Sequence, residues 1–493
     1  MTKYYITTAI DYVNAKPHIG HAYEKVIADV LARWNRLNGK DVFYLTGTDE
    51  NAQKNAQAAK EAKKEAKNFV DENVNYFIEL CEKLNLSNDY FIRTTEKKHI
   101  KTSQEIFKKV FDKGDIYKGT YEGYYCDGCE AFITEKELVN GKCPEHNKEP
   151  KHIKEENYFF KMSNYEKEML KLLEKPGFVY PDYRRKEMYN RVKEEGLKDL
   201  CVSRKGTDWG IKLPNNKDFS IYVWFDALIN YVSALDYPDG DLYKKFWPAD
   251  VHLIGKGINW FHSVIWPTML MSAGIKLPRQ IVVHGYLTVN GQKISKSLGN
   301  VIDPIKLVDK YGADPVRYIL IRDIPFGEDG DFSERALVER INSELANGIG
   351  NLVNRSLGMT EKYFEGKVPK GKNIIKFDLK KFNEHFDRLE LHLALGEIWR
   401  YIAECNKFID DKRPWELAKN NDKGLNDVIY SVLDSLRIIS ILISPFVPET
   451  SEKICKKLGM GLGKYKDIKI DLLKAGIQTN KGKVLFDKIE NGM

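Results

Sequence analysis

The sequence predicts an α/β protein: a doubly wound sheet of parallel strands that is split by an inserted domain and followed by an all-helical domain. Non-alternating apolar runs end in glycine at 42–47, 251–255 and 281–285, as is typical of strands buried on both faces of a parallel sheet. The sheet signal is interrupted over 116–215, where the chain is irregular, aromatic and cysteine-bearing. From about residue 333 onward, apolar residues recur at helical spacing.

The first strand is expected at 4–10, and Pro17 restricts the loop after it just before a helix begins near His21. Four apolar residues at helical spacing predict this helix: Val26, Val30, Trp34 and Leu37. In an open α/β sheet, ligands bind beyond the carboxyl ends of the strands. We therefore expect the chemistry of the chain in the loops that follow the strands.

These signals divide the chain into five segments. They are the first half of a Rossmann-type catalytic domain (1–115), an inserted connective domain (116–215), the second half of the catalytic domain (216–287), a linker domain (288–335) and a helical domain (336–493). In the helical segment, an apolar stripe is formed by Leu425, Val428, Val432, Leu436, Ile439 and Ile443. Ser444-Pro445 is expected to end that helix.

The composition is that of a globular protein with a sizeable core, at 42% hydrophobic and 30% charged residues over 493 positions. A formal net charge of +7 permits an anionic partner without requiring one. No apolar stretch approaches the roughly 20 residues that span a membrane, and no secretory signal is recognisable. Seven cysteines are too few for a disulfide scaffold, so a reducing, cytoplasmic location is expected.

The segment His18-Ile19-Gly20-His21 lies where the first helix should begin. Imidazoles at a helix N-terminus can hydrogen-bond phosphate oxygens, because the helix dipole favours negative charge there. Gly20 removes a side chain where a purine ring could lie flat. A surface turn is the other interpretation, and nucleotidyl-transferases of several families share a similar tetrad.

A second tetrad, Lys293-Ile294-Ser295-Lys296, precedes Ser297 in a loop flanked by glycines. Lysine is a compact point charge that suits phosphate, and two lysines on a mobile loop can neutralise a departing pyrophosphate. A solvated basic turn is the alternative interpretation. Together the two tetrads predict a site that grips a triphosphate from two sides.

Six segments in order resemble the methionyl-tRNA synthetases, which are class I aminoacyl-tRNA synthetases, in their short bacterial form. They are 7–14, 47–51, 222–227, 255–262, 289–291 and 413–415. The resemblance implies a ligase that activates L-methionine with ATP to methionyl-adenylate and pyrophosphate. It then transfers methionine to the 3′-terminal adenosine of tRNA(Met) for protein synthesis. Mg²⁺ is expected with the ATP.

The resemblance also implies roles for individual residues. His18 and His21 would contact the phosphates, Lys296 would stabilise the leaving pyrophosphate with help from Lys293, and ATP would further contact Gly20 and Gly255. Methionine contacts are expected at Ala9, Ile10, Tyr12, Asp49, Val223, Trp224, Ala227, Tyr231, Phe261, His262 and Trp266, with Asp49 on the ammonium group. From the residues alone, Asp49 could instead cap a helix and the aromatic residues could be core.

Two positions depart from the family pattern. Gly257 stands where the family usually has an aspartate that is associated with ribose binding. Asp11 stands where the family often has proline or tyrosine, so a charge is expected near the mouth of the site.

The cysteine-bearing region contains the spacing of a zinc knuckle. Cys126 and Cys129 are separated by two residues, as are Cys143 and His146, and two such pairs suit tetrahedral zinc. Because the protein would supply all four ligands, we expect one structural Zn²⁺ per chain. The resemblance implies a zinc-bearing insertion at this place, in its one-knuckle version; chance reduced cysteines are the alternative.

The helical segment places Asn351 and Arg355 four residues apart, on one face of a helix. Both side chains can bind base edges, and Trp415 can stack on an unpaired base. A capping or ion-pair arrangement is the other interpretation of Asn351 and Arg355. The resemblance implies that these three residues recognise the CAU anticodon. It also implies a monomer, since the extra C-terminal domain of dimeric relatives is not recognised.

Two alternatives stay open at this point. One is a class I synthetase for another amino acid. The isoleucine, valine and leucine enzymes normally carry a larger insertion than about 100 residues, and a cysteine enzyme would hold zinc in its catalytic core. The other alternative is a non-catalytic tRNA-binding paralogue, against which the two complete tetrads argue.

Overall fold

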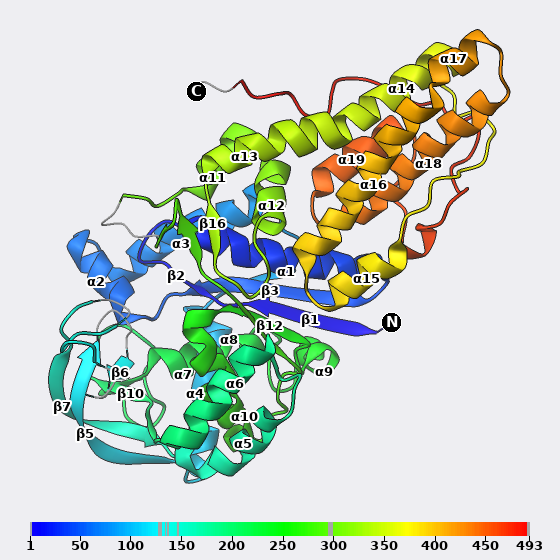
Figure 1. The fold of residues 1–493 in the computed structure, drawn as a ribbon. Coiled ribbons are helices and arrows are strands. Elements are labelled where there is room, and N and C mark those ends of the chain that lie inside the picture. Colours follow the sequence, from blue (N-terminus) through cyan, green and yellow to red (C-terminus); the bar gives the residue numbers. More distant parts are fainter. Residues whose placement is uncertain are drawn as a thin grey trace.

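A parallel sheet lies at the centre of the computed structural model, which describes residues 2–126, 131–133, 135, 138–144, 147–293 and 299–490. Its strands are β1 (Lys3–Thr8), β2 (Asp11–Tyr12), β3 (Asp41–Asp49), β4 (Tyr90–Arg93), β8 (Val179–Tyr180), β12 (Val251–Gly255) and β13 (Ile281–His284). Within these residues the order is β2-β3-β1-β12-β13-β8, with β4 also on β3, and the pairs are parallel. The predicted α/β class is confirmed (Figure 1).

Both faces of this sheet are buried, which explains why its strands do not alternate. Successive residues of one strand enter different hydrophobic clusters: Ile6 and Tyr44 pack on the face that carries α1 (Ile19–Leu37), whereas Tyr5 and Phe43 pack on the opposite face. That opposite face is covered by α4 (Lys97–Asp112), α8 (Asn230–Ser233) and α10 (Trp266–Ala273). The chain leaves β1 toward β3 on one side and β12 joins β1 on the other, so a crevice opens at their carboxyl ends.

The inserted region forms a sheet of its own, at the lower left of Figure 1. β5 (Ile116–Cys126), β6 (Ala131–Ile133), β7 (Lys151–Phe160) and β9 (Leu200–Cys201) pair antiparallel, and β10 (Ser203–Lys205) pairs with β11 (Phe219–Ile221). The helices α5 (Glu166–Glu174) and α6 (Asp182–Glu195) follow β7. The same region also contributes β8 to the central sheet, where β8 pairs with β13.

The remaining elements near the sheet either link its strands or follow its last strand, β13. They are α2 (Gln53–Glu61), α3 (Ala66–Lys83), α7 (Val223–Leu228), α9 (Asp241–Phe246), a π-helical turn (Phe261–Ile265), β14 (Leu287–Val289), β15 (Gln292–Lys293), β16 (Gly330–Phe332), α11 (Pro304–Tyr311) and α12 (Ala313–Arg322). None of the described helices is both long and apolar enough to cross a membrane.

The C-terminal part is helical, as predicted. A continuous helix comprises α13 (Glu334–Arg340), a π-helical stretch (Ile341–Gly350) and α14 (Asn351–Phe364), and the helices that follow are α15 (Leu379–Asp387), α16 (Leu391–Lys412), α17 (Pro414–Lys419), α18 (Gly424–Ile443) and α19 (Pro448–Lys457). α18 ends at Ile443, immediately before Ser444-Pro445. Its predicted apolar stripe is buried except at the partly exposed Leu425.

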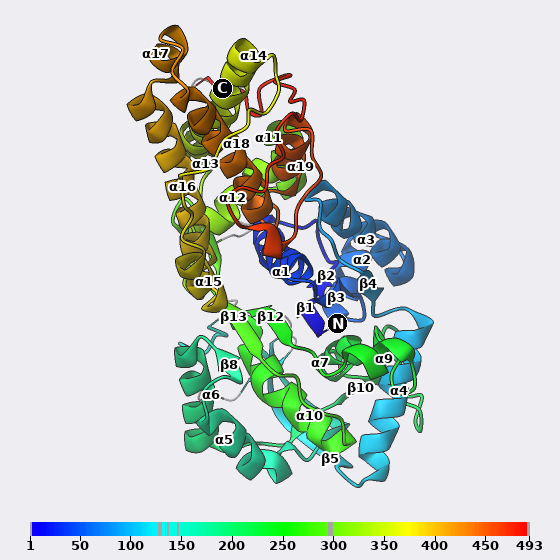
Figure 2. The same cartoon turned by 90° about the vertical axis from the view of Figure 1, so that its right-hand side faces the viewer.

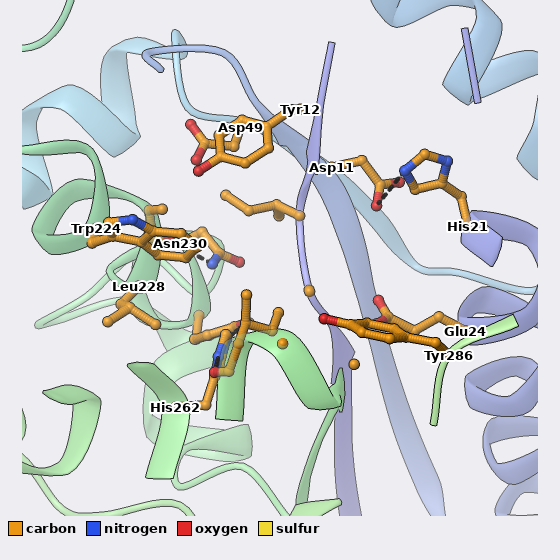
Figure 3. A pocket seen from close by; sticks show the side chains of 17 residues that line it. Asp11, Tyr12, His21, Glu24, Asp49, Trp224, Leu228, Asn230, His262 and Tyr286 are labelled. Atoms are coloured by element: carbon orange, nitrogen blue, oxygen red, sulfur yellow. Dashed lines mark hydrogen bonds and ion pairs between the residues drawn. The ribbon is translucent and has the colours of Figure 1, made fainter. Parts of the chain in front are cut away.

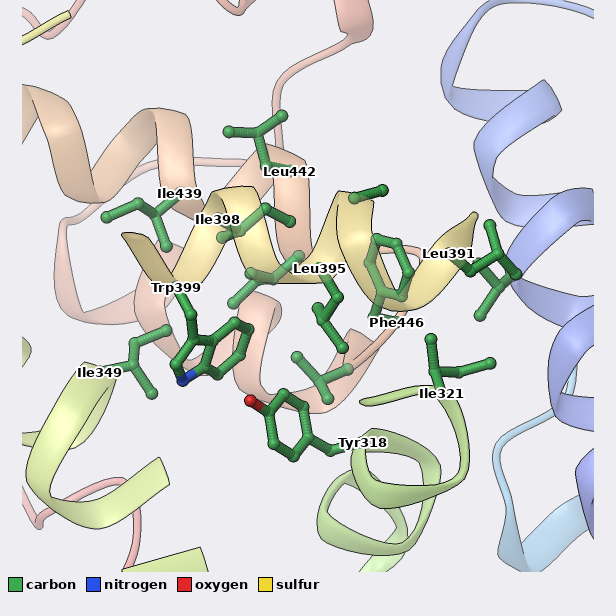
Figure 4. Packing of buried hydrophobic residues seen from close by; sticks show 14 of the residues in the cluster. Tyr318, Ile321, Ile349, Leu391, Leu395, Ile398, Trp399, Ile439, Leu442 and Phe446 are labelled. Carbon is green, nitrogen blue, oxygen red and sulfur yellow. The ribbon is translucent and has the colours of Figure 1, made fainter. Parts of the chain in front are cut away.

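One hydrophobic cluster joins the helical part to the sheet. Leu395 and Ile398 of α16 pack toward Ile439 of α18, and Tyr318 of α12 lies below Trp399 (Figure 4). The same cluster includes residues of α1 and β1. Figure 2 shows the helical part above α1 and the central sheet, with the inserted region on the far side. The sheet, α12 and the helical bundle therefore share one core.

Candidate active site

Two cavities open at the carboxyl ends of β1 and β12. The first has a volume of about 240 Å³ and is lined by Ala9, Ile10, Asp11, Tyr12, His21, Glu24, Asp49, Trp224, Ala227, Leu228, Asn230, Tyr231, Gly255, Gly257, Ile258, His262 and Tyr286 (Figure 3). The second, of about 320 Å³, is lined by His18, Gly20, His21, Tyr23, Gly255, His284, Gly285, Tyr286 and Leu287. His21, Gly255 and Tyr286 line both, so the two cavities adjoin.

The two tetrad histidines are fixed by the start of α1. The amide N–H of Gly20 donates to Nδ1 of His18 at 3.1 Å, and the amide N–H of His18 donates to Nδ1 of His21 at 3.0 Å. Burial lowers the pKa of each imidazole to about 3, so both are neutral near pH 7. Because Nδ1 accepts a hydrogen bond in each ring, the proton lies on Nε2. Each ring therefore presents an N–H donor.

The two imidazoles also explain the glycine between them. Their rings stack with centroids 3.8 Å apart, and a Cβ at Gly20 would lie 2.9 Å from Cε1 of His18. A side chain at Gly20 would displace the imidazole of His18. The absence of a side chain at Gly20 thus allows the orientation of the His18 ring and also leaves space in the second cavity.

A buried ion pair between Lys25 and Asp11 lies beside His21. Lys25, one turn along α1 and fully buried, donates through Nζ to Oδ2 of Asp11. The other carboxylate oxygen of Asp11 lies 3.9 Å from Nε2 of His21. Burial lowers the pKa of Lys25, but the neighbouring carboxylates of Asp11 and Glu24 raise it, and the net pKa is raised. Asp11, where a charge was expected near the mouth of the site, lines the first cavity, is 8% exposed and is paired with Lys25.

The inner end of the first cavity carries a tyrosine–histidine pair. Nδ1 of His262 donates to the carbonyl of Ile258 at 3.0 Å. Burial lowers the pKa of His262 to about 4, so the ring is neutral and its Nε2 accepts. The hydroxyl of Tyr231 donates to this Nε2 at 2.7 Å. The two rings give this end of the cavity aromatic faces and a hydrogen-bonded polar group.

At the other end of the first cavity, Asp49 closes β3 and pairs with Tyr12 across the strands β2 and β3. Asp49 is 2% exposed. Trp224 forms one side of the cavity, with its ring 6.3 Å from that of Tyr12 at a near-perpendicular angle. A buried carboxylate between aromatic walls can bind an ammonium group.

A hydrogen-bond network holds the helix that carries Trp224. Asp226 of α7 is fully buried and accepts from Nδ2 of Asn51 at 2.8 Å, while its other oxygen lies 2.6 Å from Nε2 of His99. Asn51 follows Asp49 by two residues. The network therefore ties α7, α4 and the loop after β3 into one rigid unit. Sequence patterns did not indicate Asn51, His99 or Asp226 as a unit, because they come from three separate segments.

Three predicted methionine contacts lie behind the lining rather than in it. Phe261 stacks on Trp224, with ring centroids 3.7 Å apart. Trp266 is buried next to Tyr231 and donates to His252 at 3.3 Å. Val223 is buried in the cluster that contains Trp224. The remaining predicted residues, Ala9, Ile10, Tyr12, Asp49, Trp224, Ala227, Tyr231 and His262, line the first cavity.

The structure adds residues that the sequence analysis did not select. Glu24 lies three residues after His21 on the same face of α1 and its carboxylate lies 3.0 Å from Nε2 of His284. Asn230 lines the first cavity one residue before Tyr231. Tyr286 follows the end of β13 by two residues. The rule that ligands bind beyond strand ends could have identified His284 and Tyr286. Helical spacing could have identified Glu24.

The second tetrad cannot be placed in this geometry. Lys293 is the last residue of β15 and its side chain lies outside the described part, as do residues 294–298 with Lys296. β15 pairs with β14, which follows directly on the second cavity residues Gly285 to Leu287. The backbone thus leads from the second cavity into the lysine tetrad.

Two predicted zinc ligands come together in the inserted region. Cys126, at the end of β5, and Cys143 are buried in one small cluster with Leu138. The other two predicted ligands, Cys129 and His146, lie outside the described residues. The six cysteines that the structure describes form no disulfide bond. Two buried thiols from separate segments fit the chemistry of a zinc site.

The predicted anticodon residues lie at the far end of the helical part. Asn351 and Arg355 of α14 line a surface groove against α16. Nδ2 of Asn351 donates to Oδ1 of Asn406 at 3.2 Å, and Arg355 pairs with Asp410 at 2.5 Å. Trp415 lies on the neighbouring α17 with 46% of its surface exposed and does not line the groove.

Comparison with known proteins decides the family. The model described as "tRNA synthetases class I (M)" matches residues 4–153 and 145–357, and that of the "Anticodon binding domain of methionyl tRNA ligase" matches 371–493. The chain belongs to the methionyl-tRNA synthetase family. The methionine–tRNA ligases of Caldanaerobacter subterraneus subsp. tengcongensis and Thermotoga maritima are each 47% identical to this synthetase. The alignments cover 99% of this synthetase and 79% and 80% of those chains.

Solved structures of the family have the same fold as this synthetase. Mycobacterium tuberculosis methionyl-tRNA synthetase in complex with methionyl-adenylate is 40% identical, with a TM-score of 0.94 over 99% of this chain and 100% of that chain. The free form of the mycobacterial enzyme is 37% identical, with a TM-score of 0.87 over 100% and 99% of the two chains.

Proposed function

We propose that this synthetase joins L-methionine to tRNA(Met) in two steps, through methionyl-adenylate. The observation that carries the proposal is the pair of adjoining cavities, one of about 240 Å³ with aromatic residues in its lining, the other beside two imidazole donors. The methionine carboxylate has to reach the α-phosphate of ATP. Cavities that share His21, Gly255 and Tyr286 allow the two groups to meet.

In the first cavity, the thioether is assigned to the Tyr231–His262 end and the ammonium to Asp49. A thioether is a soft apolar group with a weak acceptor, so it suits an aromatic wall with one polar edge. Phe261 and Trp266 act by supporting Trp224 and Tyr231 from behind.

In the second cavity, the Nε2–H groups of His18 and His21 are assigned to the phosphate oxygens. Adenylate formation is an in-line displacement at phosphorus, so the protein contributes positioning and charge stabilisation rather than a side-chain nucleophile. Lys296, with Lys293, is assigned to the departing pyrophosphate. Mg²⁺ supplies charge neutralisation when it is bound with the ATP.

The test is the exchange of labelled pyrophosphate into ATP, measured with one amino acid at a time. Exchange is expected with methionine and at background level with isoleucine, valine, leucine or cysteine. A stronger signal with another amino acid would reassign the substrate. Exchange with none of the amino acids would favour the non-catalytic paralogue.

The groove of Asn351 and Arg355, together with Trp415, is proposed to recognise the CAU anticodon. A partly exposed Trp415 can stack on an unpaired base, at about 1–3 kcal/mol per base. Trp415→Ala is expected to slow tRNA charging at least about fivefold, which corresponds to about 1 kcal/mol, and to leave pyrophosphate exchange unchanged. Leu393→Ala, at another exposed apolar residue of the helical part, is the control. Loss of exchange as well would show that Trp415 is structural.

One structural Zn²⁺ is proposed at Cys126, Cys129, Cys143 and His146, where it would hold the knuckle together. Four protein ligands leave no open coordination position for chemistry. Cys143→Ala is expected to remove about one zinc per chain and to speed proteolysis within 127–146. Cys455→Ala, at a buried cysteine of α19, is the control. Full metal content in Cys143→Ala would contradict the assignment.

A monomer in the cytoplasm completes the proposal. Sedimentation equilibrium at micromolar concentration is expected to give the mass of one chain without tRNA, and the mass of one chain plus one tRNA when tRNA is bound. A dimer mass would contradict it.

A further inference from the structure

Gly257 and Tyr286 fit each other closely at the boundary of the two cavities. A Cβ built at Gly257 would lie 2.0 Å from the hydroxyl oxygen of Tyr286 and 3.1 Å from Cζ. No side chain can therefore occupy position 257 while Tyr286 has this orientation. The phenolic hydroxyl fills the volume that a side chain at residue 257 would take.

The backbone of Tyr286 is held on two sides, and Lys256 contacts its ring. Its amide N–H donates to Oδ1 of Asp329 at 2.8 Å, and the other oxygen of Asp329 accepts from Nζ of Lys256 at 2.6 Å. Nζ of Lys256 also lies 4.6 Å from the centre of the Tyr286 ring, within the range of a cation–π contact. The backbone before it is fixed too, because a Cβ at Gly285 would meet the carbonyl of Glu328 at 2.0 Å. These contacts fix the backbone that carries Tyr286 and place Lys256 over its ring.

Tyr286 enters the first cavity from the side opposite Trp224, and it also lines the second cavity (Figure 3). ATP bound at His18 and His21 must direct its α-phosphate toward the first cavity, where the methionine carboxylate lies. The ribose is bonded to that α-phosphate, so it lies at the boundary. Of the three residues at this boundary, Gly255 has no side chain and His21 is assigned to phosphate.

We propose that the hydroxyl of Tyr286 hydrogen-bonds a ribose hydroxyl of ATP, in the place that Gly257 leaves empty. A phenol both donates and accepts, as a ribose hydroxyl does. It is also neutral near pH 7, so it does not repel the triphosphate as a carboxylate would. Tyr286 and Gly257 then form one unit: the glycine makes the space and the tyrosine supplies the polar group.

The first experiment compares the wild type with Tyr286→Phe in methionine-dependent exchange. The variant removes one oxygen and keeps the ring. KM for ATP is expected to rise about three- to tenfold, the range of one neutral hydrogen bond, with KM for methionine changed less than twofold. Tyr117→Phe, at an exposed tyrosine of the inserted sheet, is the matched control. An unchanged KM for ATP in Tyr286→Phe would overturn the proposal.

The second experiment identifies the ATP group by using 2′-deoxyATP and 3′-deoxyATP. If Tyr286 binds one ribose hydroxyl, one analogue should lose about three- to tenfold in kcat/KM with the wild type and less than twofold with Tyr286→Phe. If both analogues lose as much kcat/KM with Tyr286→Phe as with the wild type, the effects of analogue and variant multiply. That result would overturn the ribose contact, even if Tyr286→Phe impairs ATP binding. A fall in kcat alone would point to the α-phosphate and would also overturn it.

A third variant tests the unit itself. Gly257→Ala places a Cβ against the hydroxyl, so it should raise KM for ATP about as much as Tyr286→Phe does. In the double variant the two effects should not multiply, because the group that Gly257→Ala displaces is already gone. Multiplying effects would contradict the shared role.

This inference rests on the assignment of the second cavity to ATP. His18→Ala tests that assignment separately: an unchanged KM for ATP in His18→Ala would reject the cavity, whereas a raised KM with an unaffected Tyr286→Phe would reject only the role of Tyr286.

Discussion

Arg317 of α12 and Asp29 of α1 form an ion pair in which neither side chain is exposed, with Nη2 and Oδ2 2.7 Å apart. The guanidinium also donates to the carbonyls of Leu84, Pro445 and Phe446 at 2.9–3.1 Å. Burial alone would raise the pKa of Asp29, but the charges of Arg317 and Arg33 hold that pKa below its usual range. One arginine therefore joins α1, α12 and the residues that follow α18.

Breaking this pair should destabilise the protein strongly. Arg317→Met leaves Asp29 without its main counter-charge and leaves three carbonyls without a donor, at a cost of about 3–5 kcal/mol. Thermal unfolding followed by circular dichroism should show a clearly lower midpoint. Arg335→Met, in an exposed pair with Glu339, should change the midpoint little. Equal effects of the two variants would contradict the role of Arg317 as a junction.

Substitutions of His18 should separate its two roles. Asparagine keeps the acceptor that caps α1, so His18→Asn should retain thermal stability but lose about 100-fold in kcat/KM for ATP. Glutamine extends an N–H donor toward the position of Nε2, so His18→Gln should retain more activity and less stability. Equal activity of the two variants in pyrophosphate exchange would contradict the assignment of the proton to Nε2.

The pH dependence of exchange should lack a histidine step between pH 6 and 8. The pKa values of His18 and His21 are lowered to about 3 by burial, so both rings stay neutral in the free enzyme above about pH 5. The quantity to measure is kcat/KM for ATP, which reports the free enzyme. An inflection near pH 6.5 that disappears in His18→Gln would show that an imidazolium binds the phosphates.

The Asp11–Lys25 pair should behave as one unit. Lys25→Met leaves a buried carboxylate without its partner and should lower the thermal midpoint, as expected for a loss of about 3–5 kcal/mol. Asp11→Asn with Lys25→Met should recover part of that loss, because no unpaired charge remains. Lys64→Met, in an exposed pair with Glu72, is the control. A double variant as unstable as the sum of its singles would contradict the coupling.

The sequence predicted those parts of the fold in which local pattern and tertiary environment agree. The apolar run at 42–47 is buried on both faces within β3, and the stripe that ends before Ser444 is the buried side of α18. β8 was not predicted as part of the central sheet. Its two residues carry no sheet pattern of their own, and its place is set by pairing with β13.

Trp266 shows why the lining of the first cavity was harder to predict. His262 and Trp266 are four residues apart, which places them on one face of an ordinary α-helix. The turn from Phe261 to Ile265 is π-helical, and a π-helical turn adds a residue and rotates the next turn of the helix. His262 therefore lines the cavity whereas Trp266 packs behind Tyr231.

Asp11 and Gly257 show the limit of reading single positions. As an isolated change, Asp11 suggested only a charge near the mouth of the site. In the structure Lys25, which lies one turn beyond His21 on α1, pairs with Asp11. Gly257 suggested a missing group, but Tyr286 from the loop after β13 fills its place. In both cases the partner is distant in sequence, so only the fold brings the two together.

The most direct test of the two-cavity account is a crystal structure with a non-hydrolysable methionyl-adenylate analogue, such as the sulfamoyl compound. The account predicts the thioether against Tyr231 and His262, the ammonium within about 3.5 Å of the Asp49 carboxylate as expected for a charge-assisted contact, and the adenosine in the cavity of His18 and Gly20. Adenosine bound outside that cavity, or a thioether at Asp49, would contradict the account.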